Sequence, residues 1–146
     1  MRLLGGFAVL VAVAVCAAAA PEAVVPYRVE GGAIRERLAS EPGNAARGKL
    51  VVVGRDSNCL LCHAVPDAGV RFMGNVGPSL QGVGARLSEG QLRLSIVDSL
   101  RLNPESVMPS YYRMNGLNQV GQAWRGKPVL SAQQVEDTVA YLLTLR

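Results

Sequence analysis

The feature that most constrains this chain is a pair of cysteines followed at once by a histidine. Cys59 and Cys62 stand three positions apart, and His63 comes next. Two thiols at this spacing can add to the two vinyl groups of one haem, and the adjacent imidazole then reaches the iron from the same side. His63 is the only histidine in the sequence, so the opposite position on the iron must hold a methionine, a less common ligand or nothing. We therefore interpret the motif as the attachment site of one covalently bound haem c, with His63 as an iron ligand.

Residues 1–20 have the pattern of a cleavable secretory signal peptide. Arg2 precedes an apolar run from Leu3 to Val15, and alanines occupy positions 17–20. A basic start, an apolar centre and small residues before a polar region are typical of such leaders, and the run is at the lower edge of membrane-spanning length. We expect export to the periplasm, removal of Cys16 with the leader, and no membrane span in the mature protein.

Two other uses of a Cys-x-x-Cys pair fit the sequence less well. A structural zinc site takes about four ligands, whereas the cysteines and the histidine outside the leader supply only three. A thioredoxin-like dithiol would follow a strand in a βαβ pattern, which this sequence lacks.

The charge balance says little about partners. The chain has 15 Lys and Arg against 11 Asp and Glu and contains no long basic run. Such a mild excess does not predict nucleic-acid binding, and it is compatible with a complementary protein partner.

Beyond the leader, we expect an N-terminal extension, residues 21–43, and one cytochrome c domain, residues 44–146. Within the extension, Val24–Glu30 predicts an extended arm. Residues 33–39 predict a short helix, ended by the Glu41-Pro42-Gly43 breaker.

Capping residues mark the starts of three helices in the domain. Asn44 precedes a helix over 45–53, Ser88 one with Leu92, Ile96 and Leu100 on one face, and Ser131 a final helix with Val135, Val139, Leu142 and Leu143 on one face. Between the first two helices, the Gly- and Pro-rich stretch 64–86 predicts irregular loops wrapped round a ligand. We therefore predict an all-α domain whose core is completed by a haem.

Three methionines outside the leader are candidates for the sixth iron position. They are Met73, Met108 and Met114. Met108 precedes Pro109, and a residue before proline is biased towards extended conformations, which favours a ligand held in a loop. Met108 is the preferred candidate, while Met114, Met73 and an open position remain alternatives.

A Gly-Pro segment downstream of the motif offers a partner for the histidine. A ligating imidazole normally donates its second N–H to a carbonyl or carboxylate, which fixes the ring and raises its basicity. The segment is Gly77-Pro78-Ser79-Leu80, and we expect the Pro78 carbonyl to accept from His63.

Together, the helix before the Cys-x-x-Cys-His motif, the Gly-Pro-x-Leu loop, the Met-Pro pair and the C-terminal helix resemble class I cytochromes c. Longer segments are similar to the SoxX family, the monohaem subunits of the sulfur-oxidising SoxAX cytochromes. These segments are Asn58–Ala64, Gly74–Arg86, Val107–Tyr112 and Gly126–Leu142. The resemblance implies a class I cytochrome c-like fold with N- and C-terminal helices and haem-wrapping loops.

The resemblance also implies roles and partners. Cys59 and Cys62 would hold the haem, with His63 proximal and Met108 distal on the iron. The chain would form a periplasmic heterodimer with a SoxA-type subunit, and that complex would oxidatively join thiosulfate to a cysteine of the carrier SoxYZ. The reaction would take place at a SoxA haem, so this chain would accept electrons for a downstream acceptor and would not be catalytic alone.

Two other functions remain open at this point. The chain could be a free-standing periplasmic cytochrome c that carries electrons, or a ligand-binding or peroxidatic haem protein with an open distal site. For Tyr111 and Tyr112, which follow the predicted ligand loop, we expect either an interface role or burial against the haem.

Overall fold

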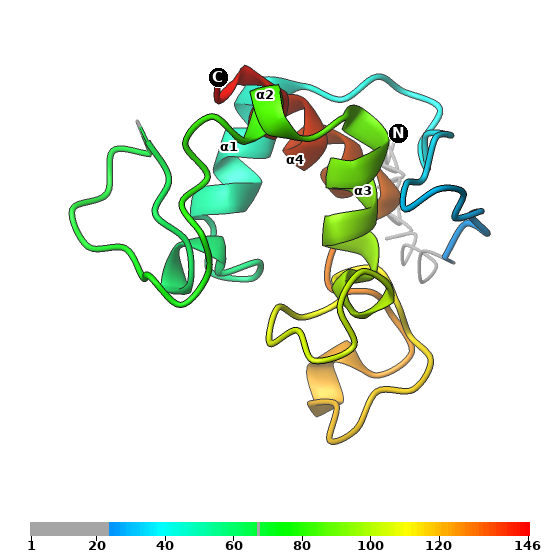
Figure 1. Ribbon diagram of the computed structural model, residues 1–146. Coiled ribbons are helices and arrows are strands. Elements are labelled where there is room, and N and C mark those ends of the chain that lie inside the picture. Colours follow the sequence, from blue (N-terminus) through cyan, green and yellow to red (C-terminus); the bar gives the residue numbers. More distant parts are fainter. Residues whose placement is uncertain (1–23, 67) are drawn as a thin grey trace, which may run out of the picture.

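A computed structural model describes residues 24–66 and 68–146, so the predicted signal peptide lies outside the described residues. The elements are α1 (Ala45–Val53), η1 (Cys59–Leu61), α2 (Val83–Arg86), α3 (Glu89–Val97), η2 (Ser99–Arg101), η3 (Gln122–Trp124) and α4 (Ala132–Thr144). Within these residues the only β-pairing is an isolated bridge between Glu30 and Ala33. The predicted all-α class is therefore confirmed, with α1 and α4 side by side and long loops below them (Figure 1).

The helices begin where the capping residues predict. The Asn44 side chain accepts from the Arg47 amide at 3.0 Å, and both Ser88 and Ser131 form reciprocal capping boxes with the residue three positions on. The predicted helix with Leu100 is too long, because α3 ends at Val97. Asp98 leaves helical geometry at φ −152°, and its carboxylate accepts from the hydroxyl of Ser110. This tertiary contact ends the helix.

Helices α1 and α4 cross with their backbones in close approach. A methyl group at Gly48 would overlap the carbonyl of Asp137, so only glycine fits at this crossing. The Asp137 carboxylate also accepts from Nε and Nη2 of Arg47, at 2.6 and 2.7 Å, and from the Asn44 amide at 2.8 Å. The start of α1 is thereby fixed to α4, which sets the direction in which the chain leaves α1 towards the cysteines.

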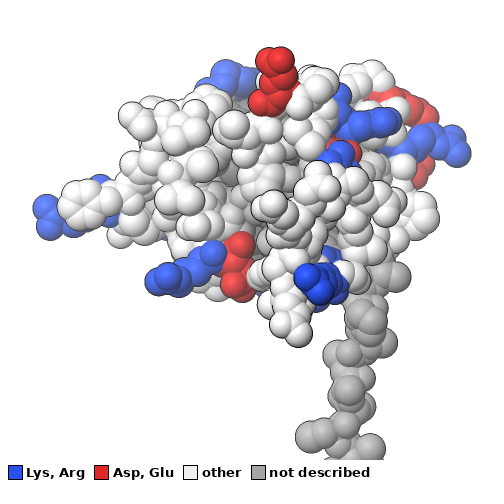
Figure 2. All heavy atoms as spheres, turned by 90° about the horizontal axis from the view of Figure 1, so that it is seen from below, with Lys and Arg blue, Asp and Glu red and all other residues white. Residues whose placement is uncertain are grey.

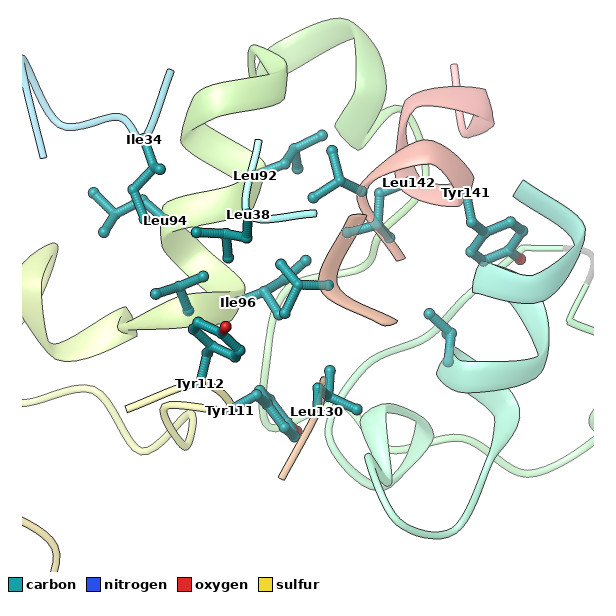
Figure 3. Packing of buried hydrophobic residues seen from close by; sticks show 14 of the residues in the cluster. Ile34, Leu38, Leu92, Leu94, Ile96, Tyr111, Tyr112, Leu130, Tyr141 and Leu142 are labelled. Atoms are coloured by element: carbon teal, nitrogen blue, oxygen red, sulfur yellow. The ribbon is translucent and has the colours of Figure 1, made fainter. Parts of the chain in front are cut away.

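The hydrophobic core lies between α3, α4 and the segments that follow α3 (Figure 3). Leu92 and Ile96 from α3 are buried, as are Val135, Val139 and Leu142 from α4, as their helical spacing predicts. Leu143 is only half-buried and packs at the edge of this core.

The predicted helix over 33–39 is wrong. The backbone of this segment is bonded to distant elements: the Ile34 amide donates to the Gly90 carbonyl at 3.0 Å, and the Leu38 amide donates to Glu136 Oε1 at 2.8 Å. The Ile34 carbonyl accepts from Arg93 Nη1 at 2.8 Å. Because these groups already have long-range partners, the segment lies along α3 and α4 without forming a turn of helix.

A buried ion pair holds the extension in place. Arg93 is 0% exposed and donates to both oxygens of Glu136, each at 2.8 Å, while the Glu136 side chain is 2% exposed. Arg93 also donates to Glu89. Both charges are therefore desolvated and fully hydrogen-bonded, which makes the pair sensitive to loss of either partner.

Candidate haem-binding site

The two cysteines lie on one turn of 3-10 helix that follows α1. Asn58 has a left-handed φ of 51°, which turns the chain sharply before η1. The Cys62 and His63 amides both donate to the Cys59 carbonyl, at 3.1 and 2.9 Å. In such a turn, residues three and four positions apart share one side, so the thiols and the imidazole are presented together.

Cys59 and Cys62 are half-buried and are not bonded to each other. Burial raises the pKa of the Cys59 thiol above its ordinary value, against smaller opposite effects of hydrogen bonds that include Ser57 and Tyr111. A catalytic dithiol needs a lowered thiol pKa. The Cys59 thiol lacks this feature of a catalytic dithiol.

The imidazole of His63 is oriented by a backbone carbonyl. Its Nδ1 lies 2.7 Å from the carbonyl oxygen of Pro78, the contact predicted from the sequence. Because a carbonyl only accepts, this nitrogen carries the proton and Nε2 keeps the lone pair that binds metals.

The loop that carries Pro78 lies directly against the histidine ring. A Cβ at Gly77 would come within 2.8 Å of His63 Nδ1 and 2.9 Å of Nε2, and closer still to Cε1. The Gly77 amide donates to the Cys62 carbonyl at 2.8 Å, and the Leu80 amide donates to the Ala64 carbonyl at 2.9 Å. The loop is thus hydrogen-bonded to the residues before and after His63, and the absence of a side chain at Gly77 allows it to come this close.

The three candidate methionines lie in different surroundings. The Met73 sulfur accepts from the Val65 amide at 3.2 Å. Met114 is 38% exposed. Met108 is half-buried against the core, and its carbonyl accepts from the Ser99 hydroxyl at 2.5 Å. Of the three, only Met108 has its backbone fixed by a buried side chain.

Both tyrosines after the Met-Pro pair are buried, so the expectation that their rings contact a partner directly is wrong. The Tyr111 hydroxyl donates to the Ser57 carbonyl at 2.7 Å, beside the cysteines. The Tyr112 hydroxyl accepts from the Val25 amide at 2.9 Å. Ser57 was not predicted from the sequence, and the only pattern that pointed to Tyr111 was its place after the Met-Pro pair.

The residues of this site fit a covalently bound haem. The thiols of Cys59 and Cys62 share one helical turn, His63 has its metal-binding nitrogen available, and Gly77 leaves the space that the ring orientation requires. In the described part of the chain, no group of three or more His, Cys, Asp or Glu side chains is placed to hold a bare metal ion. No helix there is long and apolar enough to cross a membrane.

On the face of the molecule that Figure 2 shows, basic and acidic side chains are scattered among uncharged ones.

Comparison with known proteins agrees with the geometry. The family model "Cytochrome c" matches residues 45–146. No match was found among curated proteins. The crystal structure of SoxXA from P. pantotrophus contains a chain that is 32% identical, with a TM-score of 0.77, and the match covers 85% of this chain and 98% of that one.

Two other solved cytochromes are more distant, each at 20% identity. The c-type cytochrome SorU from Sinorhizobium meliloti has a TM-score of 0.46, with 69% of this chain and 88% of that chain covered. Ferric cytochrome c-550 from Paracoccus versutus has a TM-score of 0.42, with 71% and 98% covered. The family model and the SoxXA match are the informative findings. The chain therefore belongs to the cytochrome c family, whose members carry covalently bound haem c for electron transfer, and within that family it is of the SoxX type.

Proposed function

We propose that this chain is the periplasmic electron-transfer subunit of a SoxXA-type complex that oxidatively couples thiosulfate to a cysteine of the carrier SoxYZ. The observation that carries the proposal is the 32% identity to a chain of SoxXA, because the match covers 98% of that chain. A match over nearly the whole length includes segments outside the family model, which begins at Ala45.

Cys59 and Cys62 would attach the haem, and His63 and Met108 would bind its iron. For His63, the support is the 2.7 Å contact with Pro78, which leaves Nε2 for the metal. For Met108, the support is comparative: the Met73 sulfur already accepts an amide proton, and Met114 lies on an exposed loop. The predicted heterodimer, leader cleavage and downstream electron acceptor are part of the same proposal.

The haem supplies reversible storage of one electron when it is bound. The chain's own residues set the reduction potential of the haem. Hydrogen bonding from His63 to Pro78 makes the imidazole a stronger donor, whereas a methionine sulfur favours the reduced state. Met108 is half-buried against the core, and Tyr111 is buried in it.

The coupling reaction explains why this chain needs a partner. Joining a SoxYZ thiol to thiosulfate forms one S–S bond and releases one proton and two electrons. Cys59 and Cys62 are committed to haem attachment, and the described residues contain no other cysteine to act as a nucleophile. A single haem accepts one electron at a time, so the sulfur chemistry would take place on the SoxA-type subunit and this chain would receive electrons from it.

The proposal is tested by isolating the complex from the native periplasm. A tagged chain should bring down a SoxA-type cytochrome in a constant ratio after size-exclusion chromatography. Recovery of the haem-loaded chain alone, with electron transfer to an oxidase or reductase, would instead support a free-standing carrier. A purified protein without methionine ligation that binds small ligands at the iron would support the open-site function.

A further inference from the structure

The segment that carries Met108 is held by hydrogen bonds to neighbouring parts of the fold. This segment, the Met108 loop, comprises Val107–Tyr112. Its anchors come from α3 and the residues just after it: the Ser99 hydroxyl donates to the Met108 carbonyl at 2.5 Å, and the Tyr111 amide donates to the Ile96 carbonyl at 3.0 Å. The Met108 loop is therefore hydrogen-bonded to α3 and to the residues just after it.

The segment that carries the cysteines is anchored to a different helix. This segment, the attachment loop, comprises Ser57–His63. The Ser57 hydroxyl donates to the Val51 carbonyl in the last turn of α1, and the Asn58 amide donates to the Gly54 carbonyl at 3.1 Å. The attachment loop is therefore hydrogen-bonded to the end of α1, so the two ligand-bearing segments are anchored to different helices.

One buried hydrogen bond joins these two segments directly. The Tyr111 hydroxyl donates to the Ser57 carbonyl at 2.7 Å, across 54 positions of sequence. Tyr111 is 7% exposed and Ser57 3%, so water does not compete for this bond. The Tyr111 ring lies among the core residues below α3 (Figure 3).

We propose that Tyr111 is a positioning residue that holds the Met108 loop at a fixed distance from the attachment loop, and so keeps the methionine on the iron. This inference rests on the ligand assignment made under the proposed function. A methionine sulfur is a weak, neutral ligand, so its binding depends on how far the loop can move away. Tyrosine suits this role because its hydroxyl sits at the end of a rigid ring with only two side-chain torsions.

Burial also favours the protonated form of Tyr111, in which its hydroxyl can donate. Burial raises the pKa of Tyr111 above its ordinary value, and neighbouring Cys59 and Cys62 add to the shift while they are free thiols. Thioether formation removes the cysteine charges but leaves the burial. Burial therefore disfavours loss of the Tyr111 hydroxyl proton.

The test compares two adjacent buried tyrosines in the haem-loaded protein. Tyr111→Phe removes the hydroxyl that reaches the attachment loop, whereas Tyr112→Phe removes one that accepts from Val25 in the N-terminal arm. The readouts are the far-red sulfur-to-iron charge-transfer band as a function of pH, and hydrogen exchange of the Met108 loop and the attachment loop.

Loss of one buried hydrogen bond should increase the population with the methionine detached about five- to tenfold at a given pH. The pH at which half of the band is lost should then fall by about 0.7 to 1 unit for Tyr111→Phe if one proton is released on detachment. Tyr112→Phe should leave this midpoint where it is in the unmodified protein. Both loops should exchange faster in Tyr111→Phe only.

An unchanged midpoint in Tyr111→Phe, or an equal fall in both variants, would overturn the positioning role. If the unmodified protein has no charge-transfer band, the ligand assignment itself has failed. Hydrogen exchange then decides alone: faster exchange of both loops in Tyr111→Phe but not in Tyr112→Phe supports the connection, and equal exchange in the two variants refutes it.

Discussion

The closeness of the Gly77 backbone to the histidine ring gives the sharpest single-residue prediction. In Gly77→Ala, the new methyl group would lie within 2.8 Å of Nδ1 and 2.9 Å of Nε2 of His63, whereas ordinary contact begins at 3.4 Å. The ring or the loop must therefore move by several tenths of an ångström. The contact between Nδ1 and Pro78, now 2.7 Å, is the interaction most exposed to that movement.

The expected effect is a rise in the reduction potential of the haem. The hydrogen bond makes the imidazole a stronger donor and so favours the ferric state, and its loss removes that preference. A bond worth about 1 kcal/mol corresponds to about 40 mV for one electron, since 59 mV is a tenfold change. The haem should stay attached, because Cys59 and Cys62 are unchanged.

Spectroelectrochemical titration measures this directly, with Gly121→Ala as the matched control. A Cβ at Gly121 would meet only the Trp124 ring, at 3.9 Å, so that variant should keep the original potential. Equal potentials and identical spectra in Gly77→Ala and Gly121→Ala would refute the assignment of His63 as the ligand that Pro78 orients.

Four further outcomes are expected. Met108→Ala should abolish the far-red charge-transfer band and lower the reduction potential while haem stays covalently bound; a retained band would move the ligand to Met114 or Met73. Combined Cys59→Ser and Cys62→Ser should yield little stable protein, because a domain this short relies on haem for part of its core; a haem-free protein with an unchanged melting temperature would count against this. Arg93→Met should lower the free energy of unfolding by about 3 to 5 kcal/mol, because it leaves Glu136 buried without its cation. Arg47→Met should lower the free energy of unfolding less in the same denaturant titrations, since Arg47 is 54% exposed. Equal losses in the two variants would contradict the buried-pair argument. Burial favours a raised pKa of Asp137, but hydrogen bonds from Arg47, the Asn44 amide and Gln133 outweigh it and hold that pKa below its usual value. The stabilisation of the fold by the ionised carboxylate is therefore complete above about pH 4 and is lost as the pH falls further. Asp137→Asn should flatten that part of the stability profile, and an unchanged profile would refute this role of Asp137.

Local chemistry explains which parts of the fold could be predicted. Asn44, Ser88 and Ser131 mark their helices because a cap acts within four residues of sequence. The motif and the Pro78 contact were predictable for a similar reason, since a ligating histidine needs an acceptor and the Gly-Pro segment was the nearest candidate.

The parts that were missed depend on long-range partners. Residues 33–39 have a helical composition, but their amides and carbonyls bond to Gly90, Arg93 and Glu136. The end of α3 at Val97 depends on Ser110, which is twelve positions beyond Asp98. The bond between Tyr111 and Ser57 spans 54 positions. No pattern within a short window of sequence contains these contacts.

In the proposed function, this chain receives electrons from a partner that carries out the sulfur chemistry. The decisive measurement follows the haem spectrum under anaerobic conditions after the oxidised chain is mixed with thiosulfate and SoxYZ, with and without the SoxA-type subunit. We predict that the haem is reduced only when that subunit is present, together with formation of the SoxYZ–thiosulfate conjugate. Reduction and conjugation by this chain alone, or conjugation by the full mixture without reduction of this haem, would contradict the account.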